Sequence, residues 1–407
     1  MKDIINIDFN GLYNQKLEKK YNQEFIQTTM QGYFDNNQHS LFANIAPESV
    51  ADIIDCAEYI KQNFENLVVV GIGGSSLATQ GILNSIKTKG VNVVVLDNVD
   101  PTLVANTLAQ FDLKKTAFNF VSKSGNTVEV LSVLQIVLDK LKTKTAVKRQ
   151  VIVTTTESDN PLYRFATRYK VRVVGMPKDI VGRFSGLSAV GLLPAAVAGL
   201  DIKKLLAGAN KVLAAIKKDP LDNDAYRYAI LQHSLLKKGK GEMAILPYTN
   251  SLTDIYYYYS QTLAESLGKI DKCPTTVVMV GANCQHSFFE EVLEGNKYRY
   301  TMLVRLNKFP TDIKLENKEI LDSKCDYLSQ VINAECQATL QTLTAHKRLA
   351  FTMNVEKVDE ESVGAVLTFM QMTICYLGIL MKLNPFLQPA VEELKVNIHS
   401  LIKSKLN

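Results

Sequence analysis

The first half of the chain alternates short apolar runs with longer amphipathic stretches. The runs are five or six residues long, rich in β-branched residues and bounded by turn residues, which is typical of buried strands. They cover 67–71, 91–96, 117–121, 151–155 and 171–175. Helical patterns, such as the one at 127–142, fill the intervals. Strands and helices in alternation predict a parallel, doubly wound sheet.

The second half resumes this alternation after a polar, helical stretch at 201–223. Its apolar runs cover 243–246, 276–281, 301–306 and 350–353. We therefore expect an α/β protein with two doubly wound parallel-sheet domains and a C-terminal helical segment. The expected division is an N-terminal segment (1–40), a first domain (41–200), a second domain (201–383) and a C-terminal loop and helix (384–407).

Two stretches near the C-terminus need separate treatment. Residues 363–381 form a run of 19 without a formal charge, which is long enough to cross a bilayer. This run contains Thr368, Gln371 and Thr373, and the chain has no second run of this kind, so we predict a buried core helix. Further on, Pro385 and Pro389 each push the preceding residue out of the helical region, and Pro389 suits the first position of a terminal helix.

Composition narrows the class of protein only slightly. Hydrophobic residues make up 46% of the 407 residues and charged residues 21%, as in ordinary globular chains. A net charge of +5 is too weak to indicate nucleic acid or a membrane as partner, and the basic residues at 140–149 are typical of solvated helix ends. Six cysteines without a CxxC pair, and acidic residues where a signal peptide would be apolar, predict a cytoplasmic location.

The stretch GIGGSS at 71–76 follows a predicted strand and precedes a predicted helix. Glycines allow a ligand to approach the backbone, while hydroxyl groups and the first amides of a helix can bind an anion. Dinucleotide binding is an alternative, because Asp97 ends the next strand. Against it, Ser76 occupies the place of the third glycine in that fingerprint. A plain tight turn is the third interpretation.

A second loop, SKSGNT at 122–127, also follows a strand and opens a helix. It offers three hydroxyl groups, one cation and several free amides, which suits a phosphate dianion. A simple helix cap at Asn126 or Thr127 is compatible with this interpretation. Two such loops at the carboxyl ends of strands in one sheet would meet at a switch-point crevice. A sugar or nucleotide phosphate is therefore the leading ligand class.

Two charged residues have both a structural and a functional interpretation. Arg183 lies among small and apolar residues, so its guanidinium either pairs with a buried carboxylate or awaits a substrate charge. Glu265 stands one helical turn from Gln261, but its spacing to Lys269 is also that of a surface ion pair, which local sequence favours.

His286 follows a predicted strand within GANCQHSFF at 281–289. The neighbouring Cys284 could suggest a metal, but no second Cys or His pair has ligand spacing, so we expect no metal site.

These blocks, in this order, resemble the glucose-6-phosphate isomerase family. The similarity runs from GIGGSS at 71 to NPFLQPAVEELK at 384 and includes SKSGNT, GRFSGLSAVGLLP, QTLAESLGK and GANCQHSFF. The resemblance implies two sugar-isomerase (SIS) domains and a homodimer in which the histidine reaches the site from the neighbouring subunit. A hexose 6-phosphate would be the substrate.

Matched position by position, the resemblance implies four catalytic residues. They are Glu265, Arg183, His286 and Lys395. It also implies a set of substrate-binding residues. They are Gly74, Ser75, Ser122, Lys123, Ser124, Thr127, Gly182, Gln261 and Gln388.

The implied reaction is the reversible isomerisation of glucose 6-phosphate and fructose 6-phosphate, in glycolysis and gluconeogenesis, through a cis-enediolate and without metal or cofactor. Such a step needs a base that moves a proton between C2 and C1 and a positive group near the oxyanion, roles that fit Glu265 and Arg183. His286 and Lys395 are candidates for opening the sugar ring. Two alternatives stay open: an isomerase that also accepts mannose 6-phosphate, and a non-catalytic sugar-phosphate-binding protein of the same fold.

Overall fold

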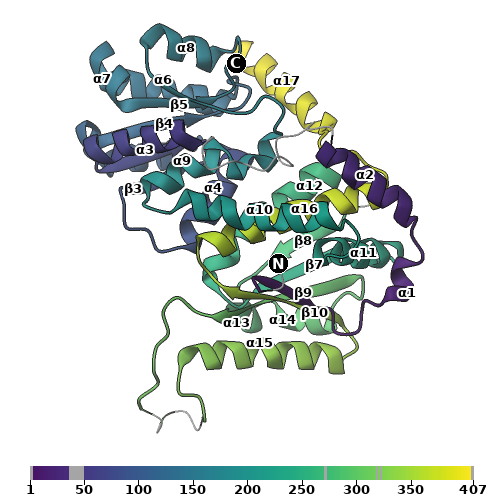
Figure 1. Ribbon diagram of the computed structural model, residues 1–407. Coiled ribbons are helices and arrows are strands. Elements are labelled where there is room, and N and C mark those ends of the chain that lie inside the picture. Colours follow the sequence, from purple (N-terminus) through teal and green to yellow (C-terminus); the bar gives the residue numbers. More distant parts are fainter. Residues whose placement is uncertain (1–2, 36–49, 270–272, 318–319, 321–322, 405–407) are drawn as a thin grey trace.

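The computed structural model describes residues 3–35, 50–269, 273–317, 320 and 323–404. Two five-stranded sheets with helices packed on them organise this part of the chain (Figure 1). The first sheet contains β2 (Asn66–Val70), β3 (Asn92–Leu96), β4 (Thr116–Val121), β5 (Val151–Thr155) and β6 (Arg172–Gly175). The second contains β1 (Ile5–Asp8), β7 (Glu242–Pro247), β8 (Thr275–Val278), β9 (Arg299–Lys308) and β10 (Leu349–Lys357). The predicted α/β class is confirmed, and a strand lies at each apolar run.

The strand orders are β3-β2-β4-β5-β6 in the first sheet and β1-β10-β9-β7-β8 in the second. Apart from β1, which is antiparallel to β10, all neighbouring strands are parallel. Among the parallel strands of each sheet, the chain starts at an inner strand, goes to one side and then returns to continue on the other. This reversal falls between β2 and β4 and between β7 and β9, and open α/β sheets bind ligands outside the carboxyl ends of strands at such switch points.

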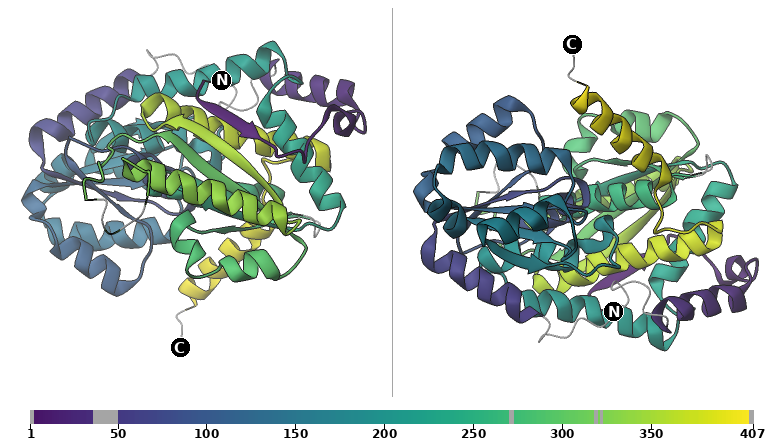
Figure 2. Two further views of the ribbon diagram at one scale, coloured as in Figure 1. Left: turned by 90° about the horizontal axis from the view of Figure 1, so that it is seen from below. Right: turned by 90° about the horizontal axis from the view of Figure 1, so that it is seen from above.

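Helices cover both faces of each sheet, as Figures 1 and 2 show. Around the first sheet they are α3 (Ala51–Asn63), α4 (Leu77–Ser85), α5 (Pro101–Ala109), α6 (Val128–Leu141), α7 (Lys144–Gln150), α8 (Pro161–Tyr169) and α9 (Ala189–Val197). Those of the second half are α10 (Ile202–Lys218), α11 (Asp224–Lys237), α12 (Thr253–Leu267), α13 (Gly281–Gln285), α14 (Phe289–Glu294), α15 (Leu328–Ala345) and α16 (Glu360–Met381). The remaining α-helices are α1 (Gln15–Glu18), α2 (Gln23–Asp35) and α17 (Pro389–Lys403).

The N-terminal residues belong structurally to the second sheet. Strand β1 pairs with β10 in the register Ile5↔Val355, and α2 packs on α16. Sequence analysis found no element here, because a four-residue strand in which buried and exposed positions alternate gives little signal. The expected boundary at 40–41 lies outside the described residues, and the division into four parts stays a prediction.

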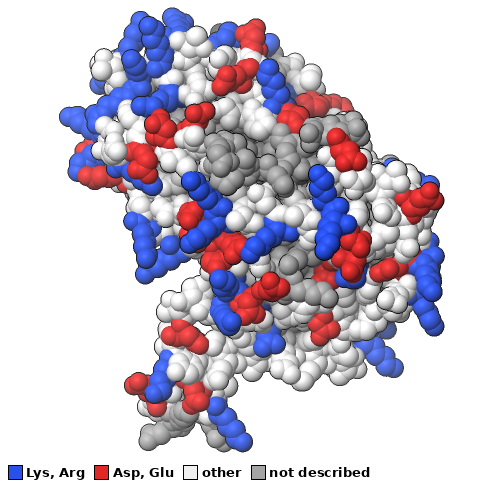
Figure 3. Space-filling view, viewed as in Figure 1, with Lys and Arg blue, Asp and Glu red and all other residues white. Residues whose placement is uncertain are grey.

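The uncharged run near the C-terminus forms α16, the one described helix that is long and apolar enough to cross a membrane. Within the structure 94% of its most apolar window is buried, and it packs against α10, α11 and α12. This confirms the prediction of a core helix. The basic cluster at 140–149 is exposed at the end of α6 and on α7, and Figure 3 shows acidic and basic side chains interspersed over the rest of that face.

Two glycines set the distance between α10 and α16. A Cβ at Gly208 would lie 1.8 Å from the carbonyl oxygen of Glu361, and one at Gly364 would lie 1.9 Å from that of Leu205. Real Cβ atoms do not approach backbone oxygens this closely, so each helix fits the other only where a side chain is missing. The close packing of the core helix therefore depends on these two positions.

We expect Gly364→Ala to lower the free energy of unfolding by about 1–3 kcal/mol, because overpacking outweighs the higher helix propensity of alanine. Urea denaturation followed by circular dichroism measures this change. The matched control is Gly241→Ala, where a Cβ has nothing within 4 Å. Equal stability of the Gly364→Ala variant and the parent would show that the two helices can move apart at no cost.

Candidate active site

The GIGGSS loop leaves β2, turns through the short 3-10 helix η3 (Gly73–Ser75) and enters α4. Gly73 has φ +63°, a conformation that side chains with a Cβ rarely adopt, and a Cβ at Gly74 would lie 2.6 Å from the carbonyl oxygen of Gly182. The loop thereby lies directly on η5 (Gly182–Leu187), the 3-10 helix that carries Arg183. The glycines thus bring the first loop to the arginine.

The SKSGNT loop leaves β4 beside it. Its Ser122 and Thr127 side chains contact each other, with 2.7 Å between the two hydroxyl oxygens. Two threonines at the end of β5 hold the loop from below: Thr155 donates to the carbonyl oxygen of Ser122 at 2.6 Å and Thr156 to that of Lys123 at 2.8 Å. The hydroxyl groups of 122 and 127 therefore have fixed positions.

Thr127 occupies the N-cap position of α6 without a capping hydrogen bond from its side chain. Thr127 is therefore the N-cap residue, as predicted. Its hydroxyl group does not accept the usual capping hydrogen bond from a backbone amide but contacts Ser122 instead. Lys123 is half-buried, and burial lowers the pKa of its ammonium group, an effect that nearby Asp179 opposes. The loop thus places hydroxyl groups, one cation and the uncapped start of a helix close together, a combination that can bind an anion.

The two loops are neighbours, as their strands predict. In the register of β2 and β4, Val70 is opposite Phe120, and a Cβ at Gly71 would lie 3.3 Å from that of Val121. On its other side the first loop meets α12, where a Cβ at Gly73 would lie 2.9 Å from Nε2 of Gln261. The two loops thus leave neighbouring strands at the switch point, as predicted, and the crevice expected between them stays a prediction.

Arg183 is the charged group around which the remaining segments meet. Its side chain is 0% exposed. Nε donates to Oγ of Ser266 at 2.7 Å, Nη1 donates to Oε1 of Gln388, and Nη2 donates to the carbonyl oxygens of Pro385 and Leu387. A guanidinium that is fully removed from water requires such partners. Burial lowers its pKa, while the nearby Glu265 raises it.

Glu265 lies on α12, one residue before Ser266. Its Oε2 is 3.7 Å from Nη1 of Arg183, and its Oε1 accepts a hydrogen bond of 2.8 Å from Nε2 of Gln261. The carboxylate side chain is 29% exposed, so it is oriented by a buried cation on one side and reachable from the other. Of the two interpretations of the arginine, the structure supplies a carboxylate partner, although a partly exposed one, and the attraction of a substrate charge stays a prediction.

The favoured ion pair between Glu265 and Lys269 is wrong. The Lys269 ammonium group donates to the carbonyl oxygens of Ser266 and Asn384, each at 2.7 Å. It therefore ties the end of α12 to the C-terminal loop. Burial and the charge of Arg183 both lower its pKa.

The C-terminal loop continues the network to Lys395. Gln388, which accepts from Arg183, donates through Nε2 to Glu392 at 3.2 Å, and Glu392 also accepts from Nζ of Lys395 at 2.7 Å. These two bonds lower the pKa of the Glu392 carboxyl group, that of Lys395 being the stronger cause. Helix α17 begins at Pro389, as predicted, and Lys395 is exposed on it.

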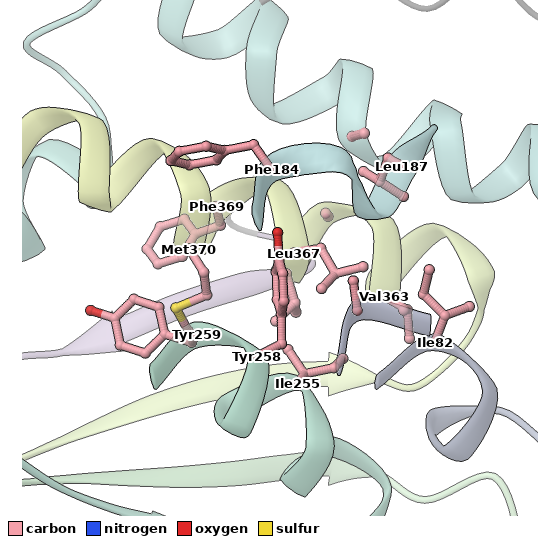
Figure 4. Close-up of a cluster of buried hydrophobic side chains, with 14 of the residues drawn as sticks. Ile82, Phe184, Leu187, Ile255, Tyr258, Tyr259, Val363, Leu367, Phe369 and Met370 are labelled. Carbon is pink, nitrogen blue, oxygen red and sulfur yellow. The ribbon is translucent and has the colours of Figure 1, made fainter. Parts of the chain in front are cut away.

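A buried cluster under η5 fixes the backbone of Arg183. Figure 4 shows Tyr258 of α12 pointing toward η5 beside Phe184, with α16 alongside. The Tyr258 hydroxyl group donates to the carbonyl oxygen of Arg183 at 2.6 Å and accepts from Nε2 of Gln371 at 2.7 Å. Burial raises the pKa of Tyr258 to about 12, so its hydroxyl group stays protonated and can donate. The core helix α16 thus supports the site through one glutamine.

His286 lies apart from this network within the chain. It follows α13 and is exposed, and its backbone amide donates to the carbonyl oxygen of Asn283. None of its described contacts reaches Arg183, Glu265 or the two loops. Cys284 is buried, and the described residues include no group of three His, Cys, Asp or Glu side chains that could hold a metal.

Several residues of the network escaped the sequence analysis. Ser266, Tyr258 and Glu392 each contact a site residue directly, and Gln371 contacts Tyr258. Only Glu392 had a usable local signal, since it stands three residues before Lys395 and four after Gln388, spacings that place side chains together on a helix. The others bond across the fold and leave no pattern in the sequence.

Two doubly wound sheets, with a hydroxyl-lined loop at one switch point and an arginine–glutamate pair beside it, give the chain the fold of the sugar-isomerase (SIS) class. A solved structure of a hypothetical protein from Thermus thermophilus has the same fold, with a TM-score of 0.88 at 27% identity over 98% of this chain and 99% of that one.

The chain belongs to the phosphoglucose isomerase family, whose model matches residues 50–407. The "Probable glucose-6-phosphate isomerase" of Haloarcula marismortui is 33% identical over 89% of this chain and 84% of its own length. The glucose-6-phosphate isomerase of Carboxydothermus hydrogenoformans is 30% identical over 98% and 94%. The resemblance seen in the sequence is therefore confirmed.

We expect Arg183→Lys to release the C-terminal loop, because a lysine cannot reach Ser266 and three oxygens of residues 385–388 together. Amide hydrogen exchange across 384–404 should accelerate by about tenfold or more, which corresponds to a loss of about 1.4 kcal/mol. Mass spectrometry of peptides from this region measures the rate. The control is Arg227→Lys, whose partners Asp222 and Asp224 lie away from the loop. Unchanged exchange across 384–404 would show that the arginine does not hold this segment.

Proposed function

We propose that Glu265 is the base with which this protein interconverts glucose 6-phosphate and fructose 6-phosphate. The reaction follows from membership of the phosphoglucose isomerase family. One observation carries the residue assignment: an accessible carboxylate lies 3.7 Å from a fully buried guanidinium, beside the switch point of the first sheet. The chemistry of this pair suits proton transfer at the carbon next to a carbonyl group.

The isomerisation moves a proton between C2 and C1 through a cis-enediolate. When Glu265 takes up the proton from C2, negative charge passes from its carboxylate to the enediolate oxygens. Arg183 lies in a dry environment, where a fixed positive charge stabilises nearby negative charge more strongly than in water. Four hydrogen bonds to protein oxygens engage its nitrogens, so it acts through its charge and by orienting Glu265. Gln261 orients the same carboxylate from the other side.

The phosphate group of the substrate is the anchor. We assign it to Ser122, Lys123, Ser124 and Thr127, because these residues combine hydroxyl groups, a cation and the uncapped start of α6. The sugar would then extend toward the segments that meet at Arg183. These contribute Gly74, Ser75, Gly182, Gln261 and Gln388. Binding energy from the remote phosphate orients the reacting carbons against the carboxylate.

Ring opening requires an acid and a base near the ring oxygen. We assign this step to His286 and Lys395. Lys395 is linked to Arg183 through Glu392 and Gln388. His286 is exposed and remote from this network in its own chain, so we propose a homodimer in which the partner subunit supplies it. An isologous dimer would then contain two equal sites, each with residues of both chains.

We also propose that the enzyme works in glycolysis and gluconeogenesis, in the cytoplasm and without a cofactor. The reaction named for its relatives is one of central sugar metabolism. All six cysteines are free, as in a reducing compartment.

The variant Glu265→Gln tests the assignment of the base. We expect loss of turnover by about 10²–10⁴-fold, the usual effect of removing a general base, and a parallel loss of solvent-hydrogen exchange at C2. Turnover is measured as fructose 6-phosphate conversion in the presence of a chelator, and exchange is measured by NMR of deuteration at C2. Calorimetry measures substrate binding. Binding should persist, because the phosphate loop is intact. Glu361→Gln, which alters a surface pair with Lys211, is the control. Retained turnover in the Glu265→Gln variant would assign the proton transfer elsewhere.

Subunit mixing tests the origin of the histidine. Glu265→Gln and His286→Ala chains should each form inactive dimers. After unfolding and refolding together, about half of the dimers are mixed, and each mixed dimer has one site with both residues intact, so about a quarter of the parental activity should return. If His286 served the site of its own chain, every site would lack one residue and no activity would return.

A further inference from the structure

The edge of the second sheet opposite the proposed active site contains a cavity of about 400 Å³. Its lining includes Lys240, which precedes β7, Arg299, which begins β9, and Leu349, which begins β10. Because these strands are parallel, their starts share one edge, whereas α12 and α13 follow the opposite ends of β7 and β8. The lining contains none of the residues that we assign to the active site, so the cavity is separate from that site.

Basic side chains surround this cavity. Among the described residues, five of its cations have no carboxylate partner. They are Lys238, Lys240, Lys297, Lys347 and Arg348. Two of them are held in place by backbone oxygens: Lys240 donates to the carbonyl oxygen of Lys297 at 2.6 Å, and Arg348 donates to that of Gly295 at 2.8 Å. The basic character of the wall is thus part of the folded structure.

Three carboxylates contact basic groups of the lining. Arg299 bonds Glu242 and Glu291, and Nδ1 of His346 lies 2.9 Å from Glu294. Arg299 balances only one of its two carboxylates, so with a neutral histidine the three carboxylates offset three of the six cations and leave three positive charges in excess. The cavity carries an excess of positive charge that a ligand with several negative charges would balance.

The floor of the cavity is apolar. Leu12 and Leu349 are partly exposed in it, whereas Leu231 and Leu235, one turn apart on α11, line it but are almost wholly buried. An inorganic anion would leave Leu12 and Leu349 uncovered, and an amphiphile with a single charge would engage few of the cations. A ligand with a flat apolar ring and a chain of phosphates matches both parts. The volume is within the usual range of small-molecule sites.

We propose that this cavity binds a nucleoside triphosphate, with its base against the leucines and its phosphates among the lysines. The site is distinct from the hexose-phosphate site and requires no residue that we assign to catalysis.

Calorimetric titration of the whole protein with ATP tests the proposal. The buffer contains a chelator, and saturating fructose 6-phosphate occupies the active site. We expect one ATP per chain and an affinity that falls as salt is added. The double variant Lys297→Glu, Lys347→Glu should bind ATP at least about tenfold more weakly, since two attractive contacts become repulsive. Its isomerase activity should equal that of the parent, which shows that it folds.

The matched control is Lys140→Glu, Lys148→Glu, which makes the same change in net charge on α6 and α7 and should leave ATP binding unchanged. Inorganic triphosphate should bind more weakly than ATP, because it cannot cover the leucines. The proposal is overturned if fructose 6-phosphate abolishes ATP binding, if both double variants weaken it equally, or if inorganic triphosphate binds as tightly as ATP.

Discussion

A single buried guanidinium holds the centre of this molecule together. Arg183 joins η5, the end of α12 and the C-terminal loop through four hydrogen bonds and one ion contact, with its side chain wholly removed from water. A charge in that position would be strongly destabilising without these partners. The segments whose oxygen atoms accept hydrogen bonds from Arg183 must therefore lie next to one another. Glu265 lies close to the guanidinium because its neighbour Ser266 is one of the acceptors.

Other contacts hold in place the segments that surround Arg183. Glycines at 73 and 74 let the first loop lie against η5 and α12, which places the proposed phosphate-binding elements of the first sheet beside a helix of the second half. Tyr258 and Gln371 fix the arginine backbone from beneath, and the close packing of α10 on α16 fixes the helix that carries Gln371. Core packing and site geometry thus belong to one connected set of contacts.

Most of the fold could be predicted from sequence, and the reasons are local. Runs of β-branched residues locate the strands, and Pro389 locates the start of α17 because proline has no amide hydrogen to lose there. Strand β1 was missed because four residues are too few to show a strand pattern. Only its pairing with β10 in the structure identifies it as a strand. Lys269 was misjudged because helix spacing showed Glu265 as a partner, whereas its ammonium group donates to two carbonyl oxygens, one of them that of Asn384, 115 residues away. The same distance effect hid the partners of Arg183, which are up to 205 residues from it in sequence. For the candidate site, therefore, the ordered blocks of family resemblance supplied what local patterns could not.

The pairing of β1 with β10 also bears on how the chain is made. Asn10 donates to the carbonyl oxygen of Ala350, 340 residues later, so the first strand emerges from the ribosome long before its neighbour exists. The sheet formed by 66–175 has all its strands early and can form while translation continues, whereas the other sheet must wait for almost the whole polypeptide. During that interval β1 is an unpaired edge, and its brevity and alternating Asn and Asp residues limit its tendency to pair with other nascent chains.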